Sequence, residues 1–411
     1  MKTISVKKVL VILLCLVSVL AHGFFEDIGR DARARGMANA MVSIYGDVHS
    51  IHYNPAGTAR TRNLELNLIW GKPLTMTALN DNSSFSDIYV ASLMPFTNGL
   101  NHSWLIRWLF KGLTFGNEDF MFKNGAMAYS FYQRATSLTD TSVTERMITL
   151  NYAKILDDVI FKGAKLAAGF NLDFYMLSFN ANADSMANPS ITSTSAFSMG
   201  LDFGVIYDFA KTIRLGIVFE NLLKPNYSFF GGDDKAPSNT KLGGSMFFNK
   251  LLFFENLTLT LNYVTYGKYD ETDNTVTLSS WHYAFESWWF ENHFAFRGGL
   301  TLGDDEQSEI STGISFLLPM GEHVISVDYA LTIPLGVSGT RHILALTWKW
   351  EQPKYAFVYD KKRAAEMKRL ADLEKKQNMQ GGNDKKKTDT NTDGKDGGKD
   401  KKKKDTTKKK K

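Results

Sequence analysis

The residues that can carry chemistry are few and scattered along the chain. Of the eight histidines, His49 and His52 lie three positions apart, and a metal site there needs a third ligand, for which Asp47 is the nearest candidate. Packing is the preferred interpretation of this pair. The sequence has no phosphate-binding loop, no nucleophile elbow and no paired-carboxylate motif that indicates catalysis, so we expect neither an enzyme nor a cofactor.

Two arginines occupy positions suited to anion binding. Arg214 and Arg297 lie in segments where apolar residues alternate with small or polar ones, and Asp202 lies in a third. Alternation places these side chains on the face opposite the apolar residues. An arginine there can bind a ligand carboxylate or pair with an acidic residue of the N-terminal segment 24–62 and hold that segment in place, and the second interpretation is preferred. The same face carries glycines that can permit a kink in a strand: Gly204, Gly216 and Gly299.

The alternation extends over most of the chain and indicates an all-β fold. A soluble sandwich has this pattern with a core inside, whereas a transmembrane barrel turns its apolar face to lipid. Segments of about ten residues or more, with Gly and Ala opposite the apolar face, favour a transmembrane antiparallel β-barrel. We expect about fourteen strands, near residues 63–75, 84–94, 124–134, 143–153, 163–178, 196–209, 212–221, 239–248, 256–267, 275–286, 292–302, 307–318, 321–332 and 340–350.

The connections between these strands are unequal in length. With both chain ends periplasmic, residues 179–195 and 222–238 become long external loops, and residues 208–211 become a short periplasmic turn. Residues 95–123 do not fit this pattern of short periplasmic turns, because they form a long connection in which 103–110 can be an extra strand or a helix. An interfacial helix or a lumen insert is the preferred interpretation. The stretch 281–296, which includes His282 and His293, is expected in an aromatic girdle.

Residues 31–62 differ from everything that follows. They are rich in Ala, Gly and Met up to Met41. Asp47 then offers a helix cap for residues 48–53, and Asn54-Pro55 ends that run because proline disfavours the α conformation in the residue before it. A plug ahead of a barrel and a loose arm on a β domain both explain this segment.

A family resemblance favours the plug. The run 36–40, the turn at Gly46-Asp47 and the tetrad 54–57 resemble the N-terminal hatch of the long-chain fatty-acid transporter family of bacterial outer membranes. They are equally similar to related barrel subunits of a bacterial protein-secretion system. The resemblance extends loosely over residues 24–350 and implies a fourteen-stranded barrel with the hatch in its lumen. The residues that carry the hatch motif are Gly36, Asn54, Pro55, Ala56 and Gly57.

The resemblance also implies a function. It predicts outer-membrane uptake of hydrophobic molecules, with long-chain fatty acids as the expected ligand. Phe24 and Phe25 match the family's ligand-contacting N-terminus by position and type, and Arg214 and Arg297 are the candidates to bind the carboxylate. Passage would require the hatch to shift. The alternative is an adaptor or anchoring subunit for secreted or periplasmic proteins.

The sequence predicts further parts near both ends of the chain. Residues 1–23 have a charged start, an apolar run and small residues, which predict a signal peptide, and the single cysteine, Cys15, lies within it. Residues 24–62 are the expected hatch and 63–352 the expected barrel in the outer membrane. Residues 353–376 are charged and compatible with a short helix, and 377–411 are too polar to fold.

The tail dominates the overall charge. Residues 353–411 hold 19 Lys and 2 Arg against 10 Asp and Glu, or +11, so the net charge of +5 leaves 5 − 11 = −6 for the rest. Solubilisation and binding of an anionic surface explain such a tail equally well. A periplasmic tail has peptidoglycan, lipid head groups or a periplasmic protein as candidate partners, and nucleic acid is not expected.

Overall fold

The computed structural model describes part of the chain in detail. The described residues are 30–61, 63–75, 84–96, 125–138, 141–158, 162, 164–181, 193–210, 212–227, 235–236, 238–269, 275–304, 308–335, 339–350 and 369. The chain divides into two compact units, Met1–Pro353 and Lys354–Lys411. The predicted signal peptide, Phe24, Phe25, the segment 103–110 and nearly all of the charged tail lie outside the described residues.

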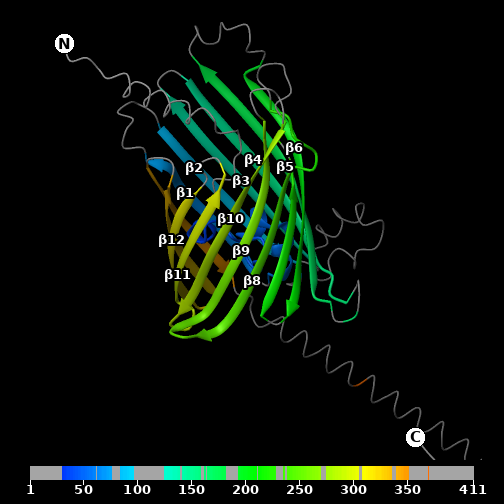
Figure 1. Cartoon of the computed structure of the whole chain (residues 1–411), viewed down its shortest axis with the longest axis vertical. Coiled ribbons are helices and arrows are strands. Elements are labelled where there is room, and N and C mark those ends of the chain that lie inside the picture. The colour runs from blue at the N-terminus through cyan, green and yellow to red at the C-terminus, as the bar shows by residue number, and fades with distance from the viewer. Residues whose placement is uncertain are drawn as a thin grey trace, which may run out of the picture. The chain divides into compact units, whose positions relative to one another are not determined.

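Fourteen antiparallel strands close into a barrel in chain order, and β1 pairs with β14 (Figure 1). This confirms the predicted all-β barrel and its strand number. The strands are β1 (Leu64–Thr75), β2 (Ser84–Pro95), β3 (Gly125–Leu138), β4 (Thr141–Ile155), β5 (Leu166–Ala181), β6 (Ser195–Ala210), β7 (Ile213–Glu220), β8 (Asn239–Leu251), β9 (Phe254–Tyr269), β10 (Thr275–Trp289), β11 (Phe294–Gly303), β12 (Glu309–Met320), β13 (His323–Pro334) and β14 (Thr340–Trp350).

The two faces of the wall differ as the alternation predicts. In β14 the outward side chains of Leu344 and Trp348 are 49% and 44% exposed, whereas the inward Ala345 and Thr347 are buried. Large apolar side chains cover the outward face of the other strands in the same way, which suits contact with lipid. Among the described residues, none of the helices is long and apolar enough to cross a membrane.

Residues 30–61, here called the inner segment, lie inside the barrel (Figure 1). They form the short helices α2 (Ala32–Gly36) and α3 (Ser50–Tyr53) and the 3₁₀ helix η1 (Pro55–Arg60). The Asp31 carboxylate caps α2 by accepting the Ala34 amide at 2.9 Å.

The start of α3 differs from the prediction. Asp47 does not cap it: His49 occupies the N-cap position without a side-chain cap. The Asp47 carboxylate instead accepts hydrogen bonds from Arg33 and, at 3.1 Å, from the Ser50 hydroxyl.

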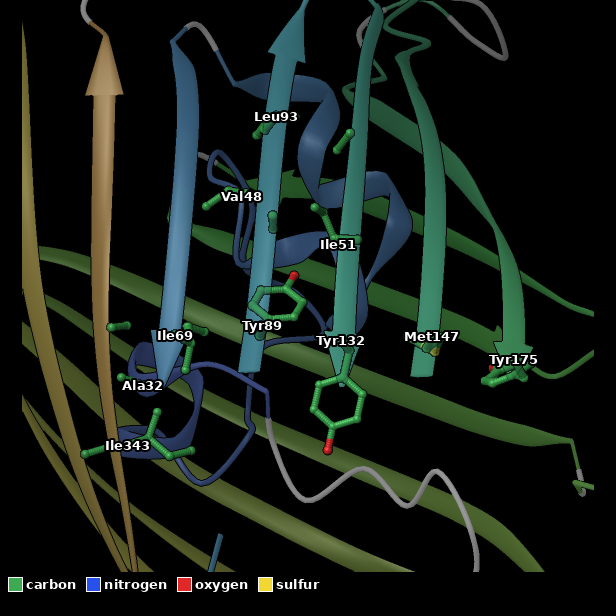
Figure 2. Close-up of a cluster of buried hydrophobic side chains, with 14 of the residues drawn as sticks. Ala32, Val48, Ile51, Ile69, Tyr89, Leu93, Tyr132, Met147, Tyr175 and Ile343 are labelled. Atoms are coloured by element: carbon green, nitrogen blue, oxygen red, sulfur yellow. The ribbon is translucent and has the colours of Figure 1, made fainter. Parts of the chain in front are cut away.

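Apolar side chains join the inner segment to the wall. Figure 2 shows Val48 and Ile51 of the inner segment beside Tyr89 and Leu93 of β2, and all four are buried. A second cluster is built around methionines of the inner segment itself, and a third joins alanines of η1 to β4, β5 and β6. The hydrophobic core of this barrel is therefore the interface between the inner segment and the wall.

Candidate functional site

The interface between the inner segment and the wall is the candidate site, and glycines on the wall shape it. A Cβ placed on Gly169 of β5 would lie 2.5 Å from the Pro55 carbonyl oxygen, and one on Gly299 of β11 would lie 2.8 Å from the Ala38 amide. No other residue type permits such an approach. The inward glycines therefore seat the inner segment; the kink that the sequence also permits at such glycines stays a prediction. Glycines of this kind are Gly169, Gly204, Gly216, Gly243, Gly299 and Gly313.

The Asn-Pro-Ala-Gly tetrad forms a rigid connection between α3 and the wall. The Asn54 side-chain oxygen accepts the Ala56 amide at 3.0 Å and caps η1, in which Pro55 occupies the first turn. The Asn54 amide group donates to the carbonyls of Val42 at 2.7 Å and of Val205 in β6 at 3.2 Å. One buried side chain thus joins three parts of the chain, which explains why asparagine precedes the proline. At the other motif position, Gly36 packs directly against Gly313 of β12.

A buried ionic network joins α2 to one side of the wall. Arg33 donates to both carboxylate oxygens of Glu286 in β10, at 2.9 and 2.6 Å, and to Asp47. Arg297 of β11 donates to the same Glu286 at 2.6 Å and to Asp328 of β13 at 3.3 Å. Glu286 is only 2% exposed, so these charges interact in a poorly screened environment.

A second pair fixes the other face of α2. Arg35 is 2% exposed and donates to the two carboxylate oxygens of Glu309 in β12, at 3.0 and 3.1 Å. Arg341 of β14 donates to Glu309 as well, at 3.2 Å. Two-point binding of this kind fixes both the position and the orientation of the guanidinium group.

A third cluster holds the opposite end of the inner segment. Arg60 of η1 contacts Asp157 at 2.8 Å, and the Tyr45 hydroxyl donates to Asp208 at 3.1 Å. Arg214 contacts Asp208 at 3.1 Å, and its guanidinium carbon lies 3.7 Å from the centre of the Tyr45 ring. Three clusters therefore bind the inner segment to strands on both sides of the barrel.

The two histidines of the inner segment have separate partners. His49 contacts the Asp31 carboxylate at 2.8 Å. Burial alone would lower the pKa of His49, but Asp31 and Asp47 more than offset this and raise the pKa to about 9. The His52 ring contacts Arg30 and the Ser130 hydroxyl, each at 3.1 Å. No group of three metal-ligating side chains suited to a metal ion occurs within the described residues.

The structure places the predicted residues as follows. Arg214, Arg297 and Asp202 face inward, but the acidic partners of both arginines belong to the wall and not to the inner segment. The prediction for His282 was wrong: it faces the inner segment, and its ring contacts the Ala38 carbonyl oxygen at 2.7 Å. A role of the two arginines and of Phe24 and Phe25 in ligand binding stays a prediction.

Sequence reasoning missed the charged residues that join α2 to the wall. Arg33, Arg35, Glu286 and Glu309 were not singled out. The sequence does contain one usable signal: Arg33 and Arg35 alternate with alanines in a segment of small residues. If that segment is buried, both arginines need carboxylate partners, because charged residues are almost never buried unpaired.

Sequence comparison identifies the family. The family of type IX secretion system membrane proteins PorP/SprF matches residues 113–335, which are 223 of the 411 residues. The chain belongs to the PorP/SprF family. The match covers β3 to β13 and therefore most of the wall that holds the inner segment. No protein with a curated description matches the chain.

Solved structures similar to this PorP/SprF barrel are outer-membrane channels. The toluene transporter TbuX of Ralstonia pickettii has a TM-score of 0.52 and 10% identity, covering 80% of this chain and 100% of the transporter. The monoaromatic hydrocarbon channel CymD has a TM-score of 0.52 and 12% identity over 80% and 98% of the two chains. The P. putida toluene transporter TodX has a TM-score of 0.51 and 9% identity over 79% and 99%. These similarities confirm the predicted fold, and at this level of identity they show the fold alone.

Proposed function

We propose that this protein is an outer-membrane anchoring subunit of a protein-secretion assembly and that its barrel is closed at rest. The observation that carries the proposal is the binding of the inner segment by ionic clusters on both sides of the lumen, closely packed around α2 and partly buried at η1. Membership of the PorP/SprF family supports the secretion context. The function requires no catalysis and no cofactor, because holding a partner protein at the membrane is a binding task.

The same clusters argue against uptake of an apolar ligand. To open the lumen, the contacts of Arg33 with Glu286 and of Arg35 with Glu309 must break. An uncompensated buried charge costs about 3–5 kcal/mol. A hydrocarbon offers no charged group to replace these contacts and a fatty acid offers a single carboxylate, whereas a polypeptide can offer several charged groups of both signs. Fatty-acid uptake therefore remains the second candidate, supported by resemblance of the hatch motif only.

A complementation experiment distinguishes the two functions. Cells that lack the protein are compared with cells that express it, and both export of surface proteins and uptake of labelled oleate are measured. The anchoring function predicts that export fails in the deletion strain while oleate uptake is unchanged. Loss of oleate uptake with normal export would overturn the proposal in favour of transport.

A conductance measurement tests the closed state separately. Purified protein in a planar bilayer should show no steady current, because the inner segment lies buried within the barrel. A stable open channel in the wild-type protein would contradict a barrel that is closed at rest.

A further inference from the structure

Two carboxyl groups lie next to each other on the inward face of adjacent strands. Asp173 belongs to β5 and Asp202 to β6, which pair along most of their length (Figure 1). In this pairing Asp202 lies opposite Asn171 and Asp173 lies opposite Gly200, so the two acids are diagonal neighbours. Their side chains are close enough to form a hydrogen bond with each other.

This acid pair differs from the other buried acids of the lumen. Glu286, for example, accepts hydrogen bonds from two arginines. Asp173 accepts instead from the Thr149 hydroxyl at 2.5 Å, and Asp202 accepts from the Asn221 amide at 2.9 Å. Among the described residues, no arginine, lysine or histidine contacts either acid. Asp173 is only 1% exposed, and its Oδ2 atom has no hydrogen-bond donor from a neutral or basic group.

A single proton makes this arrangement stable. Two ionised carboxylates that share a buried site repel each other, and an ionised carboxylate can only accept hydrogen bonds. If Asp202 carries a proton, it donates to the free Oδ2 of Asp173. The pair then has one negative charge in place of two, and each oxygen that faces the partner acid takes part in the shared hydrogen bond.

Charged and titratable groups surround the pair on several elements without replacing this proton. Lys241 forms a 2.6 Å ion pair with Glu220. Arg30 contacts the His52 ring at 3.1 Å and acts on Asp173 only from a longer distance. The titratable and charged groups near the pair are Tyr175 of β5, Glu220 of β7, Lys241 of β8, Arg30 of the inner segment and Tyr227, whereas β4 contributes the neutral Thr149.

Amide side chains connect the pair to the inner segment. The Asn171 amide group donates to the Ile51 carbonyl of α3 at 2.9 Å and to Asp202 at 3.5 Å. The Asn151 amide group of β4 donates to the Asn171 side-chain oxygen at 2.8 Å and to the Pro55 carbonyl of η1 at 3.1 Å. A second negative charge on the pair would draw the Asn171 amide group away from Ile51, because a charged acceptor binds a donor more strongly than a carbonyl does.

We propose that Asp173 and Asp202 form a proton-binding pair that holds α3 and η1 against the wall while it keeps one shared proton, and loosens them when it loses that proton. The hold is therefore complete at low pH and weakens as pH rises through the value at which the pair becomes doubly ionised. The proposal concerns how the inner segment is held, so it does not depend on the secretion context.

Infrared spectroscopy of the purified full-length protein tests the shared proton, because a protonated carboxyl group and an ionised carboxylate absorb at different frequencies. Near neutral pH the wild-type protein should have a protonated-carboxyl band that Asp173→Asn and Asp202→Asn each remove, since the new amide donates to the remaining carboxylate in place of the proton. Asp87→Asn is the matched control and should keep the band, because Asp87 is paired with Arg134 at 3.0 Å. Absence of the band, or a band that neither variant removes, overturns the proposal.

A cysteine reporter tests the effect on the inner segment. Ala59 of η1 is buried, so maleimide modification of an Ala59→Cys protein, relative to an exposed cysteine at the same pH, reports loosening of η1. All proteins compared carry His49→Gln, because His49 titrates in the same range. The relative rate should rise about tenfold or more between about pH 5 and about pH 9, and Asp202→Asn should keep it low throughout.

The outcomes of this comparison are distinct. An equal rise with and without Asp202→Asn overturns the proposal, as does a wild-type rate that does not change with pH. If the Asp202→Asn protein does not fold, the wild-type protein decides: its carboxyl band must disappear over the same pH range in which η1 becomes reactive. Export of surface proteins from the deletion strain tests the proposed function separately.

Discussion

The close fit between wall glycines and the inner segment gives the sharpest prediction. Gly243 and Gly244 are adjacent in β8, but Gly243 faces the inner segment and Gly244 faces outward. A Cβ on Gly243 would lie 2.7 Å from the Cβ of Val42, which is buried, whereas one on Gly244 would meet only a Leu215 methyl carbon at 3.8 Å. Gly243→Val should therefore displace the inner segment, and Gly244→Val should not.

The size of the effect follows from overpacking. The quantity affected is the fraction of molecules in which the inner segment has left its position against the wall, here called the open population. Extra carbon atoms in a well-packed core cost about 1–3 kcal/mol. If the cost is relieved when the inner segment leaves its seat, the open population rises by about 5- to 150-fold. The outward valine gains lipid contact at a position with room for it, so its effect on that population should be close to zero.

A cysteine reporter measures the open population. Ala34 lies in α2 and is buried, and the expected mature chain has no cysteine because Cys15 precedes the predicted cleavage site. The rate at which a water-soluble maleimide modifies an Ala34→Cys protein reports exposure of the inner segment. Equal modification rates for the Gly243→Val and Gly244→Val versions would refute the idea that inward glycines seat the inner segment.

Other perturbations test the ionic contacts, the pH response and the ligand. Arg35→Met should lower the free energy of unfolding in urea by about 3–5 kcal/mol, and adding Glu309→Gln should recover part of it; additive losses would deny the coupling. Because the pKa of His49 is raised to about 9, the stability that its charge contributes is full below about pH 6.5 and lost as pH rises through about 9. Maleimide modification, expressed relative to that of an exposed cysteine at the same pH because the thiolate fraction also rises, should therefore accelerate between pH 7 and 10, and His49→Gln should abolish that relative increase. Replacing Phe24 and Phe25 with glutamine should leave binding of labelled oleate unchanged; a loss of saturable binding would favour uptake.

The barrel itself was predictable from the sequence because its physical cause is local. Alternation such as Leu344, Leu346 and Trp348 on one face, with Ala345 and Thr347 on the other, follows from the two-residue period of an extended chain. That period predicted the strand number and the inward direction of Arg297. The expected pairing of Arg297 with an acidic residue of the inner segment was wrong, because alternation gives the face of a residue and not its partner.

Tertiary structure alone decided what holds the inner segment in the lumen. Glu286 and Arg33 are 253 positions apart, and no local pattern relates their side chains. Whether an inward glycine bends a strand or seats another segment likewise depends on what lies 3 Å away across the lumen. Alternation is a property of a single strand, so the sequence shows it directly. The place where the inner segment packs depends on which strands face it once the barrel has closed. Barrel closure brings the arginines of α2 against carboxylates of β10 and β12. Because these groups are buried, each arginine needs its carboxylate partner and each carboxylate needs its arginine.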